Sequence, residues 1–344
     1  MAVKADDDLV DVPKLTAWLR HELPADGEAT VTRLGAETGI GNALFLVHWG
    51  GRSMVLRRPP AERITASAGD TDRERRLLQA LVGTGVRHPE YIAWCADPGV
   101  IGAPFLLMEQ VDGFTPVAEL PAHLDNAGSR NLLGLEATDA LAELSLVDWR
   151  AAGLEGFGKP EGFLDRQVGR WLWQLDSYAS RELPGLTELA SWLRAHTPRT
   201  QATGILHGDY SLFNVMCAHD APLRVNAIVD WDTATIGDPI MDFGHLTARW
   251  DEPGEKTTLG SVDFADRTGL TKRADMAERY AGRTGWDLSA LPYYQAVSLF
   301  KLGVIMEGHY AKGVRDGSEA ALLHAETGPG LILDALACAR GERA

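Results

Sequence analysis

The sequence has few cysteines and lacks a zinc-ligand pattern. Three cysteines occur among 344 residues, at Cys95, Cys217 and Cys338. They are odd in number and isolated, and none has a second Cys or a His at the spacing of a zinc site. A disulfide framework and a zinc site are therefore not expected, and we predict buried, inert thiols.

Positive charge and long apolar runs are also scarce. Lys and Arg number 33 against 48 Asp and Glu, a net charge of −15, so neither nucleic acid nor an anionic membrane surface is expected as the main partner. The longest nearly apolar run, residues 100–108, is far too short to span a bilayer, and the acidic N-terminus is unlike a secretory signal. We expect a cytoplasmic globular protein, and the sequence leaves monomer and homodimer open.

The first hundred residues have the pattern of a small sheet with helices. Asp11 and Pro13 are placed as the N-cap and first-turn proline of an amphipathic helix. Gly50 and Gly51 suit the positive φ angles of a two-residue hairpin turn. Strand-like runs mark residues 43–49, 54–56, 91–95 and 105–111, and helical periodicity marks residues 70–81.

After Asp112 the pattern changes to long helices with short strand-like runs between them. Helical spacing marks residues 133–144, 164–175 and 291–306, and strand-like runs occupy residues 204–207, 214–217 and 224–231. We therefore predict an α+β chain of two lobes. A small antiparallel sheet occupies residues 1–111, and a larger, mainly helical lobe occupies residues 112–344.

Three oxygen-bearing side chains follow short strand-like runs. Asp209 and Asn214 are five positions apart, and Asp230 ends a later apolar run. Mg²⁺ prefers a few carboxylate or amide oxygens together with phosphate oxygens, so Asn214 and Asp230 are candidate metal ligands for a nucleoside triphosphate. Asp209 is then left to accept a proton, which is the division of work described for kinases.

These side chains belong to a longer signature. His-Gly-Asp-x-x-x-x-Asn, Asp-Trp-Asp and Gly-Asp-Pro-x-x-Asp occur in this order at residues 207–214, 230–232 and 237–242. Together they resemble the aminoglycoside phosphotransferase and choline kinase-like enzymes, which are relatives of the protein kinases. Residues 55–60 and 101–105 resemble the subgroup associated with acyl-CoA dehydrogenases.

The resemblance implies a bilobal, protein kinase-like fold and a kinase reaction. The γ-phosphoryl group of ATP or GTP would pass, with Mg²⁺, to a hydroxyl of a small molecule. An aminoglycoside and a hydroxyacyl-CoA-type metabolite both stay open as acceptors. Two rival functions also stay open: a metal-dependent hydrolase, which leaves Asn214 unexplained, and a non-catalytic nucleotide-binding pseudokinase.

The nucleotide side of the site is expected in the first lobe. Backbone N–H groups around Gly39, Gly41 and Asn42 are candidates to cover the phosphates, although a plain turn is the alternative. Glu109 and Val111 are placed like the kinase hinge that binds adenine, and a simple linker fits them equally well.

Arg57 occupies the position of the kinase strand lysine that holds phosphates, with Glu74 as its candidate partner. Glu74 shares a helix face with three leucines, and a buried carboxylate is costly unless it is paired. A solvated Glu74 is the alternative. Arginine in place of lysine departs from the general kinase pattern, but the resemblance to the acyl-CoA dehydrogenase-linked subgroup implies it. The guanidinium is larger and forked, so its phosphate contacts would differ from those of lysine.

Five further residues are given supporting or local roles. The resemblance implies that His207 organises the loop and that Asp242 braces it, with a solvated helix Asp as the alternative. Asp238 is predicted as an N-cap before a first-turn proline. Asp232 would share the strand face of the preceding metal-ligand aspartate and touch a second metal or only water. Ser145 stands where relatives often have histidine.

Overall fold

The computed structural model describes residues 9–35, 42–59, 70–178, 181–318 and 324–342. The chain divides into two compact units. The first comprises residues 1–112 together with residues 152–154 and 227–232, and the second comprises residues 113–151, 155–226 and 233–344. The predicted lobes are contiguous, whereas two short later segments group with the first unit.

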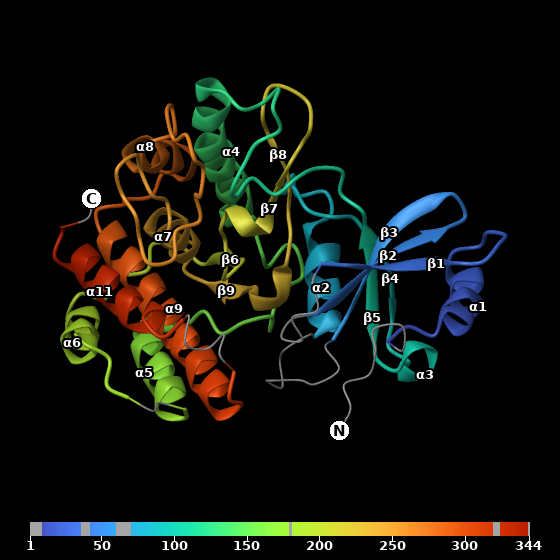
Figure 1. Ribbon diagram of the computed structural model, residues 1–344, viewed down its shortest axis with the longest axis horizontal. Coiled ribbons are helices and arrows are strands. Elements are labelled where there is room, and N and C mark those ends of the chain that lie inside the picture. Colours follow the sequence, from blue (N-terminus) through green and yellow to red (C-terminus); the bar gives the residue numbers. More distant parts are fainter. Residues whose placement is uncertain (1–8, 36–41, 60–69, 179–180, 319–323, 343–344) are drawn as a thin grey trace. The chain divides into compact units, whose positions relative to one another are not determined.

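The first unit contains a five-stranded antiparallel sheet (Figure 1). Its strands are β1 (Thr30–Leu34), β2 (Ala43–Trp49), β3 (Arg52–Arg58), β4 (Tyr91–Cys95) and β5 (Phe105–Glu109), in the order β1-β2-β3-β5-β4. The predicted hairpin is confirmed, because Gly50 and Gly51, with φ angles of 55° and 76°, connect β2 to β3. Arg57 lies in β3 opposite Leu106 of β5.

Among its described residues, three helices pack in this unit: α1 (Val12–Glu22), α2 (Thr71–Leu81) and α3 (Pro98–Ile101). Side-chain caps fix the beginnings of the two longer helices. Asp11 accepts the N–H of Lys14, and Asp70 accepts the N–H of Arg73, each at 3.1 Å. Both predicted helices are therefore confirmed, and α2 buries its leucine face against β4 and β5.

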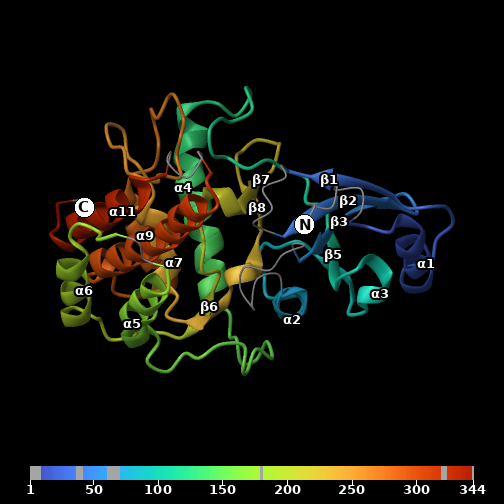
Figure 2. The same ribbon diagram turned by 60° about the horizontal axis from the view of Figure 1, so that its bottom comes forward.

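The second unit is mainly helical. Its helices are α4 (Ala127–Ser145), α5 (Phe163–Asp176), α6 (Leu186–Ala195), α7 (Ile240–Ala248), α8 (Arg273–Thr284), α9 (Leu291–Arg315) and α11 (Thr327–Ala339). Figures 1 and 2 both show α9 and α11 side by side, and α9 also contacts α7. Gly244 permits the α7–α9 contact, because a Cβ there would lie 2.5 Å from the Cβ of Tyr294.

Short strands and turns connect these helices. β6 (Gly204–Leu206) pairs antiparallel with β9 (Thr235–Gly237), and β7 (Val215–Cys217) pairs with β8 (Val225–Ile228). One turn of 3-10 helix, Leu212–Asn214, lies between β6 and β7, and another, Trp231–Thr233, lies between β8 and β9. Residues 207–214 and 230–232 of the signature therefore lie mainly on loops and 3-10 turns held by strand ends, whereas residues 237–242 lead from β9 into α7.

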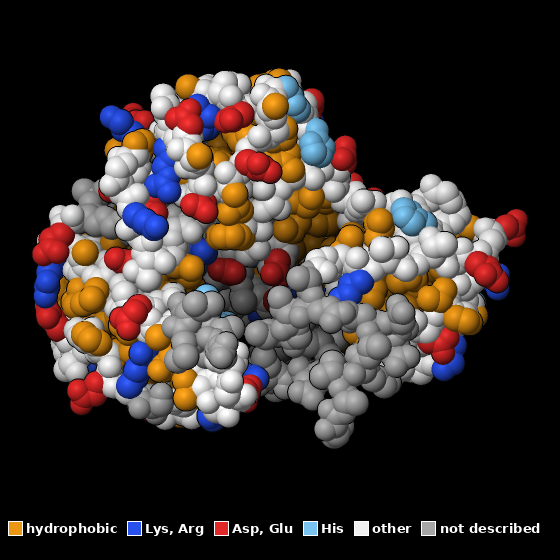
Figure 3. Space-filling model, viewed as in Figure 1, with side chains coloured by type: hydrophobic (Ala, Val, Ile, Leu, Met, Phe, Trp, Pro, Cys, Tyr) orange, Lys and Arg blue, Asp and Glu red, His pale blue; other side chains and the backbone are white. Residues whose placement is uncertain are grey.

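Three further observations concern the cysteines, the apolar character of the helices and the surface charge. Cys95, Cys217 and Cys338 are buried and none is in a disulfide, as predicted. Among the described helices, none combines the length and apolar character that crossing a bilayer requires. On the face shown in Figure 3, acidic and basic side chains are interspersed over the helical unit.

Candidate active site

The loop that follows β6 is shaped by a glycine and a threonine. Gly208 has a φ of +84°, and a Cβ at this position would lie 2.6 Å from the carbonyl oxygen of Thr233. The Thr233 hydroxyl donates to the carbonyl of His207 at 2.8 Å. A close backbone approach therefore requires glycine in the His-Gly-Asp sequence.

Asp242, in the first turn of α7, braces this loop. It is 2% exposed, and its two carboxylate oxygens accept the N–H groups of His207 and Gly208 at 2.6 and 2.9 Å. Burial raises the pKa of Asp242, while His207 and the two N–H groups act in the opposite direction. The solvated alternative for Asp242 is therefore wrong.

Asn214 and His207 fix the backbone around Asp209. The Asn214 amide nitrogen donates to the carbonyl of Asp209 at 2.8 Å and to its Oδ2 at 3.2 Å. The Asp209 N–H donates to Nδ1 of fully buried His207 at 3.3 Å. Both contacts leave the Asp209 side chain 43% exposed, so the carboxylate can still meet a ligand.

Three basic side chains beside Asp209 were not predicted. His245 Nε2 lies 3.1 Å from Asp209 Oδ1. Arg249 Nη1 lies 3.5 Å from the same His245 nitrogen, and Lys301 of α9 donates to the carbonyl of Gly208. Burial alone would raise the pKa of Asp209, but the hydrogen bond from His245 and the nearby Lys301 ammonium hold it well below its usual range.

The first unit holds Arg57 between three carboxylates. Its Nε lies 3.0 Å from Glu74 Oε2, and its Nη2 lies 2.7 Å from Asp230 Oδ1 and 2.8 Å from Asp232 Oδ2. Glu74 is 2% exposed, so the expected ion pair is present and the solvated alternative is wrong. Burial raises the pKa of Glu74 to about 7, against the attraction of Arg57.

The expected strand face for Asp230 and Asp232 is wrong. β8 ends at Ile228, Asp230 has a φ of +65°, and a 3-10 turn begins at Trp231. The two carboxylates therefore do not alternate along a strand; they converge on one guanidinium. Asp232 also accepts a hydrogen bond from the side-chain amide of Asn42 at 2.5 Å.

The hinge and glycine-turn predictions are only partly within the described residues. Gly39 and Gly41 lie outside them. Glu109 ends β5, and its N–H donates to the carbonyl of Glu90 at 2.9 Å. That N–H is engaged in the sheet, so adenine contacts stay a prediction for the Glu109 carbonyl and for Val111.

The N-cap prediction for Asp238 is wrong by one residue, because Asp238 directly precedes the N-cap. α7 begins at Ile240 with Pro239 as its N-cap, although Asp238 Oδ1 still accepts the Ile240 N–H at 3.1 Å. Its Oδ2 accepts the hydroxyl of Tyr294 at 3.0 Å. Burial raises the pKa of Asp238 to about 6.

Ser145 has a packing role at the end of α4. Its buried hydroxyl donates to the carbonyl of Leu141 at 2.8 Å and lies 2.8 Å from the hydroxyl of Tyr280 in α8. The serine that stands in place of the usual histidine therefore joins α4 to α8.

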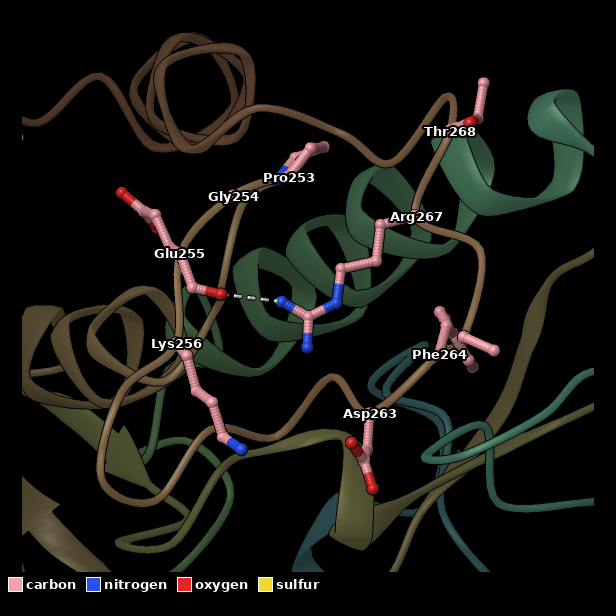
Figure 4. Close-up of a pocket in the computed structure, with 9 residues that line it drawn as sticks. Pro253, Gly254, Glu255, Lys256, Asp263, Phe264, Arg267 and Thr268 are labelled. Carbon is pink, nitrogen blue, oxygen red and sulfur yellow. Dashed lines mark hydrogen bonds between the residues drawn. The ribbon is translucent and has the colours of Figure 1, made fainter.

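A concavity of about 390 Å³ lies in the connection between α7 and α8 (Figure 4). Arg267 points into it and donates to the carbonyls of Glu255 and Val262 at 3.0 and 2.8 Å. Lys256 and Asp263 also line it. None of the predicted site residues lies in this lining.

Comparison with solved structures supports a kinase-like fold. A crystal structure from Ralstonia eutropha JMP134, provisionally named an aminoglycoside phosphotransferase, is 29% identical, with a TM-score of 0.82 over 96% of this chain and 98% of that one. A choline kinase from Cryptosporidium parvum is 12% identical, with a TM-score of 0.65 over 96% of each chain. The α+β fold class is therefore confirmed.

Sequence comparison identifies relatives that are longer than this chain, and it also identifies a protein family. Human acyl-CoA dehydrogenase family member 11 is 29% identical over 309 residues, which are 88% of this chain and 39% of that protein. The Gallus gallus protein of the same name is 31% identical over 83% of this chain and 37% of its own length. This chain thus spans less than half of those relatives. Residues 32–279 match the phosphotransferase enzyme family, and the chain therefore belongs to that family.

Proposed function

We propose that this chain transfers the γ-phosphoryl group of ATP or GTP to a hydroxyl group of a small molecule. The observation that carries this proposal is the geometry of Asp209. His245 and Asn214 contact its two carboxylate oxygens, its pKa is well below the usual range, and its side chain is 43% exposed. A fixed carboxylate can accept a hydrogen bond from an acceptor hydroxyl and align it for in-line attack.

In this reaction the acceptor oxygen forms a bond to the γ-phosphorus while the bond to the β-γ bridging oxygen breaks. The hydroxyl proton passes to Asp209 and the electron pair of the broken bond leaves with the nucleoside diphosphate. A carboxylate whose pKa is well below its usual range is a weak base, so Asp209 mainly orients the hydroxyl and takes its proton late. This suits a loose transition state.

Asn214 and Asp230 fit Mg²⁺ by the chemistry of their donor atoms. The bonds from Asn214 to Asp209 use the amide nitrogen, and the amide oxygen is the atom that a metal ion needs. The Asp230 side chain is 50% exposed. Amide and carboxylate oxygens are hard ligands of the kind Mg²⁺ prefers. When bound, the ion would neutralise charge on the phosphate oxygens.

Arg57 is proposed to bind the nucleotide phosphates. Arg57 is 4% exposed, its guanidinium is charged at all working pH values, and the ion pair to Glu74 fixes its Nε side. The Nη2 group, which contacts Asp230 and Asp232, is the part that would exchange those carboxylates for phosphate oxygens.

We propose a hydroxyl-bearing acyl-CoA thioester as the acceptor. Two observations support this choice: the relatives are named acyl-CoA dehydrogenases, and buried Arg249 and partly buried Lys301 place positive charge near Asp209. That charge favours an anionic acceptor. An aminoglycoside is the second candidate, because solved structures with this fold carry that name and the chain has a net charge of −15.

An acceptor screen tests the proposal. Purified protein with Mg²⁺ and either ATP or GTP is incubated with 3-hydroxybutyryl-CoA, kanamycin or choline, and the acceptor is analysed by mass spectrometry for an added phosphoryl group. We expect phosphorylation of the thioester and a loss of kcat of about 10²- to 10⁴-fold in Asp209→Asn. Nucleotide hydrolysis without a phosphorylated acceptor would favour the hydrolase, and binding without turnover would favour the pseudokinase.

A further inference from the structure

One face of α7 contacts three consecutive residues of the catalytic loop. Asp242 and His245 are three positions apart, so their side chains lie on the same side of the helix. Asp242 accepts the N–H groups of His207 and Gly208. His245 reaches the next residue, Asp209. The register of α7 therefore sets both the backbone of the loop and the side chain of its aspartate.

The contact between His245 and Asp209 fixes the proton on one ring nitrogen. Nε2 lies 3.1 Å from Oδ1, and an ionised carboxylate can only accept, so Nε2 must carry the proton. Arg249 is also only a donor and lies farther away, at 3.5 Å. Burial lowers the pKa of His245 to about 4, so a neutral imidazole donates this hydrogen bond.

Two donors then hold the two oxygens of the same carboxylate. His245 contacts Oδ1, and the amide nitrogen of Asn214 donates to Oδ2 at 3.2 Å. Each carboxylate oxygen has a second lone-pair site, and 43% of the Asp209 side chain is exposed. The carboxylate is therefore fixed in orientation and still able to receive an acceptor hydroxyl.

We propose that His245 is a positioning residue, which holds Asp209 in the orientation that aligns the acceptor hydroxyl. This inference rests on the proposed phosphotransferase function and adds a residue outside its signature motifs. His245 acts through Asp209, so its loss lets the carboxylate turn away from the attack line. Misplacement of a reacting group costs up to about 10²-fold in rate, whereas nucleotide affinity depends on other side chains.

Three variants test this role with the acceptor that the wild-type protein phosphorylates. His245→Leu introduces an apolar side chain of similar volume and removes the hydrogen-bond donor. We expect kcat to fall roughly 10- to 100-fold while the KM for ATP stays within about twofold. His245→Gln restores a donor and should recover most of kcat. Thr247→Val, on the same buried helix, is the control for packing and should leave kcat unchanged.

The outcomes separate this inference from the proposed function. Equal kcat in His245→Leu and wild type overturns the inference alone, and so does failure of His245→Gln to recover any activity when both variants are folded. Wild-type protein that phosphorylates no acceptor in the screen overturns both.

A measurement on the wild-type protein covers the case in which His245→Leu does not fold. ¹⁵N NMR of the histidine rings should show His245 neutral and protonated on Nε2, with a shift of that signal in Asp209→Asn. A proton on Nδ1, or an Nε2 signal that Asp209→Asn leaves in place, would overturn the inference.

Discussion

At the scale of single residues, burial and hydrogen-bond donors act in opposite directions on the acidic groups around α7. Asp209 has enough donors and positive charge nearby to stay ionised. Asp238 is fully buried and receives the Ile240 N–H and the side-chain hydroxyls of Tyr294 and Thr200, yet burial prevails and raises its pKa to about 6. The two carboxyl groups therefore differ in charge at mildly acidic pH.

The raised pKa of Asp238 predicts a pH-dependent stability. Between pH 4 and 6 the folded protein binds more protons at Asp238 than the unfolded chain does, so the free energy of unfolding falls as pH rises. Relative to Asp238→Asn, which does not titrate, wild-type stability should fall by about 2 kcal/mol across this range. Urea unfolding at several pH values measures the free energy of unfolding of both proteins.

Asp316→Asn is the control, because the pKa of Asp316 is shifted in the opposite direction to that of Asp238. Asp316 is exposed beside Lys312, which lowers its pKa, so its contribution to stability grows as pH rises through the acidic range. Asp316→Asn should lose that gain. Parallel stability curves for wild type and Asp238→Asn between pH 4 and 6 would show that Asp238 titrates normally in the fold.

At the scale of elements, the helix beginnings and turns that could be predicted from the sequence are those determined by residues close to them along the chain. Asp11 and Asp70 cap helices through N–H groups three residues away, and Gly50 with Gly51 adopts the positive φ angles that a two-residue turn requires. The left-handed backbone of Asp230 could not be predicted in this way, because Arg57, 173 positions earlier, supplies its side-chain partner.

The same limit applies to the candidate site. The signature motifs gave Asp209, Asn214 and Asp242, which lie within or beside one loop. Lys301 comes from α9, about ninety positions later, and no local pattern connects it to Gly208. His245 was within reach of sequence reasoning, since its spacing of three from Asp242 places both on one helix face.

Close helix packing gives a prediction at this scale. In Gly244→Ala the new Cβ would lie 2.5 Å from the Cβ of Tyr294 and force α7 away from α9. Overpacking of this kind lowers the free energy of unfolding by about 1–3 kcal/mol. The midpoint of urea unfolding, with an unchanged m-value, measures the loss.

Gly282 offers a matched control on α8. A Cβ there meets no atom within 4 Å, so Gly282→Ala should raise stability by about 0.5–1 kcal/mol through helix propensity alone. Equal effects of the two substitutions would contradict the account of the α7–α9 contact.

At the scale of the whole molecule, the proposed reaction needs groups from both units. Arg57, Glu74 and Asp230 belong to the first unit, whereas Asp209 and Asn214 belong to the second. Each unit has its own hydrophobic core, and the site residues of each unit are held by contacts within that unit. For the proposed reaction, Asn214 and Asp230 must nevertheless hold the same nucleotide-bound ion.

A double-mutant cycle on Mg²⁺–ATP binding tests that requirement most directly. Calorimetry without acceptor compares wild type, Asn214→Ala, Asp230→Asn and the double variant. Residues that share one ligand are coupled, so we expect each single change to weaken binding and the double variant to lose about 1 kcal/mol less than the sum. Losses that add to within about 0.3 kcal/mol would show that the two residues do not hold one ion, and would contradict the account.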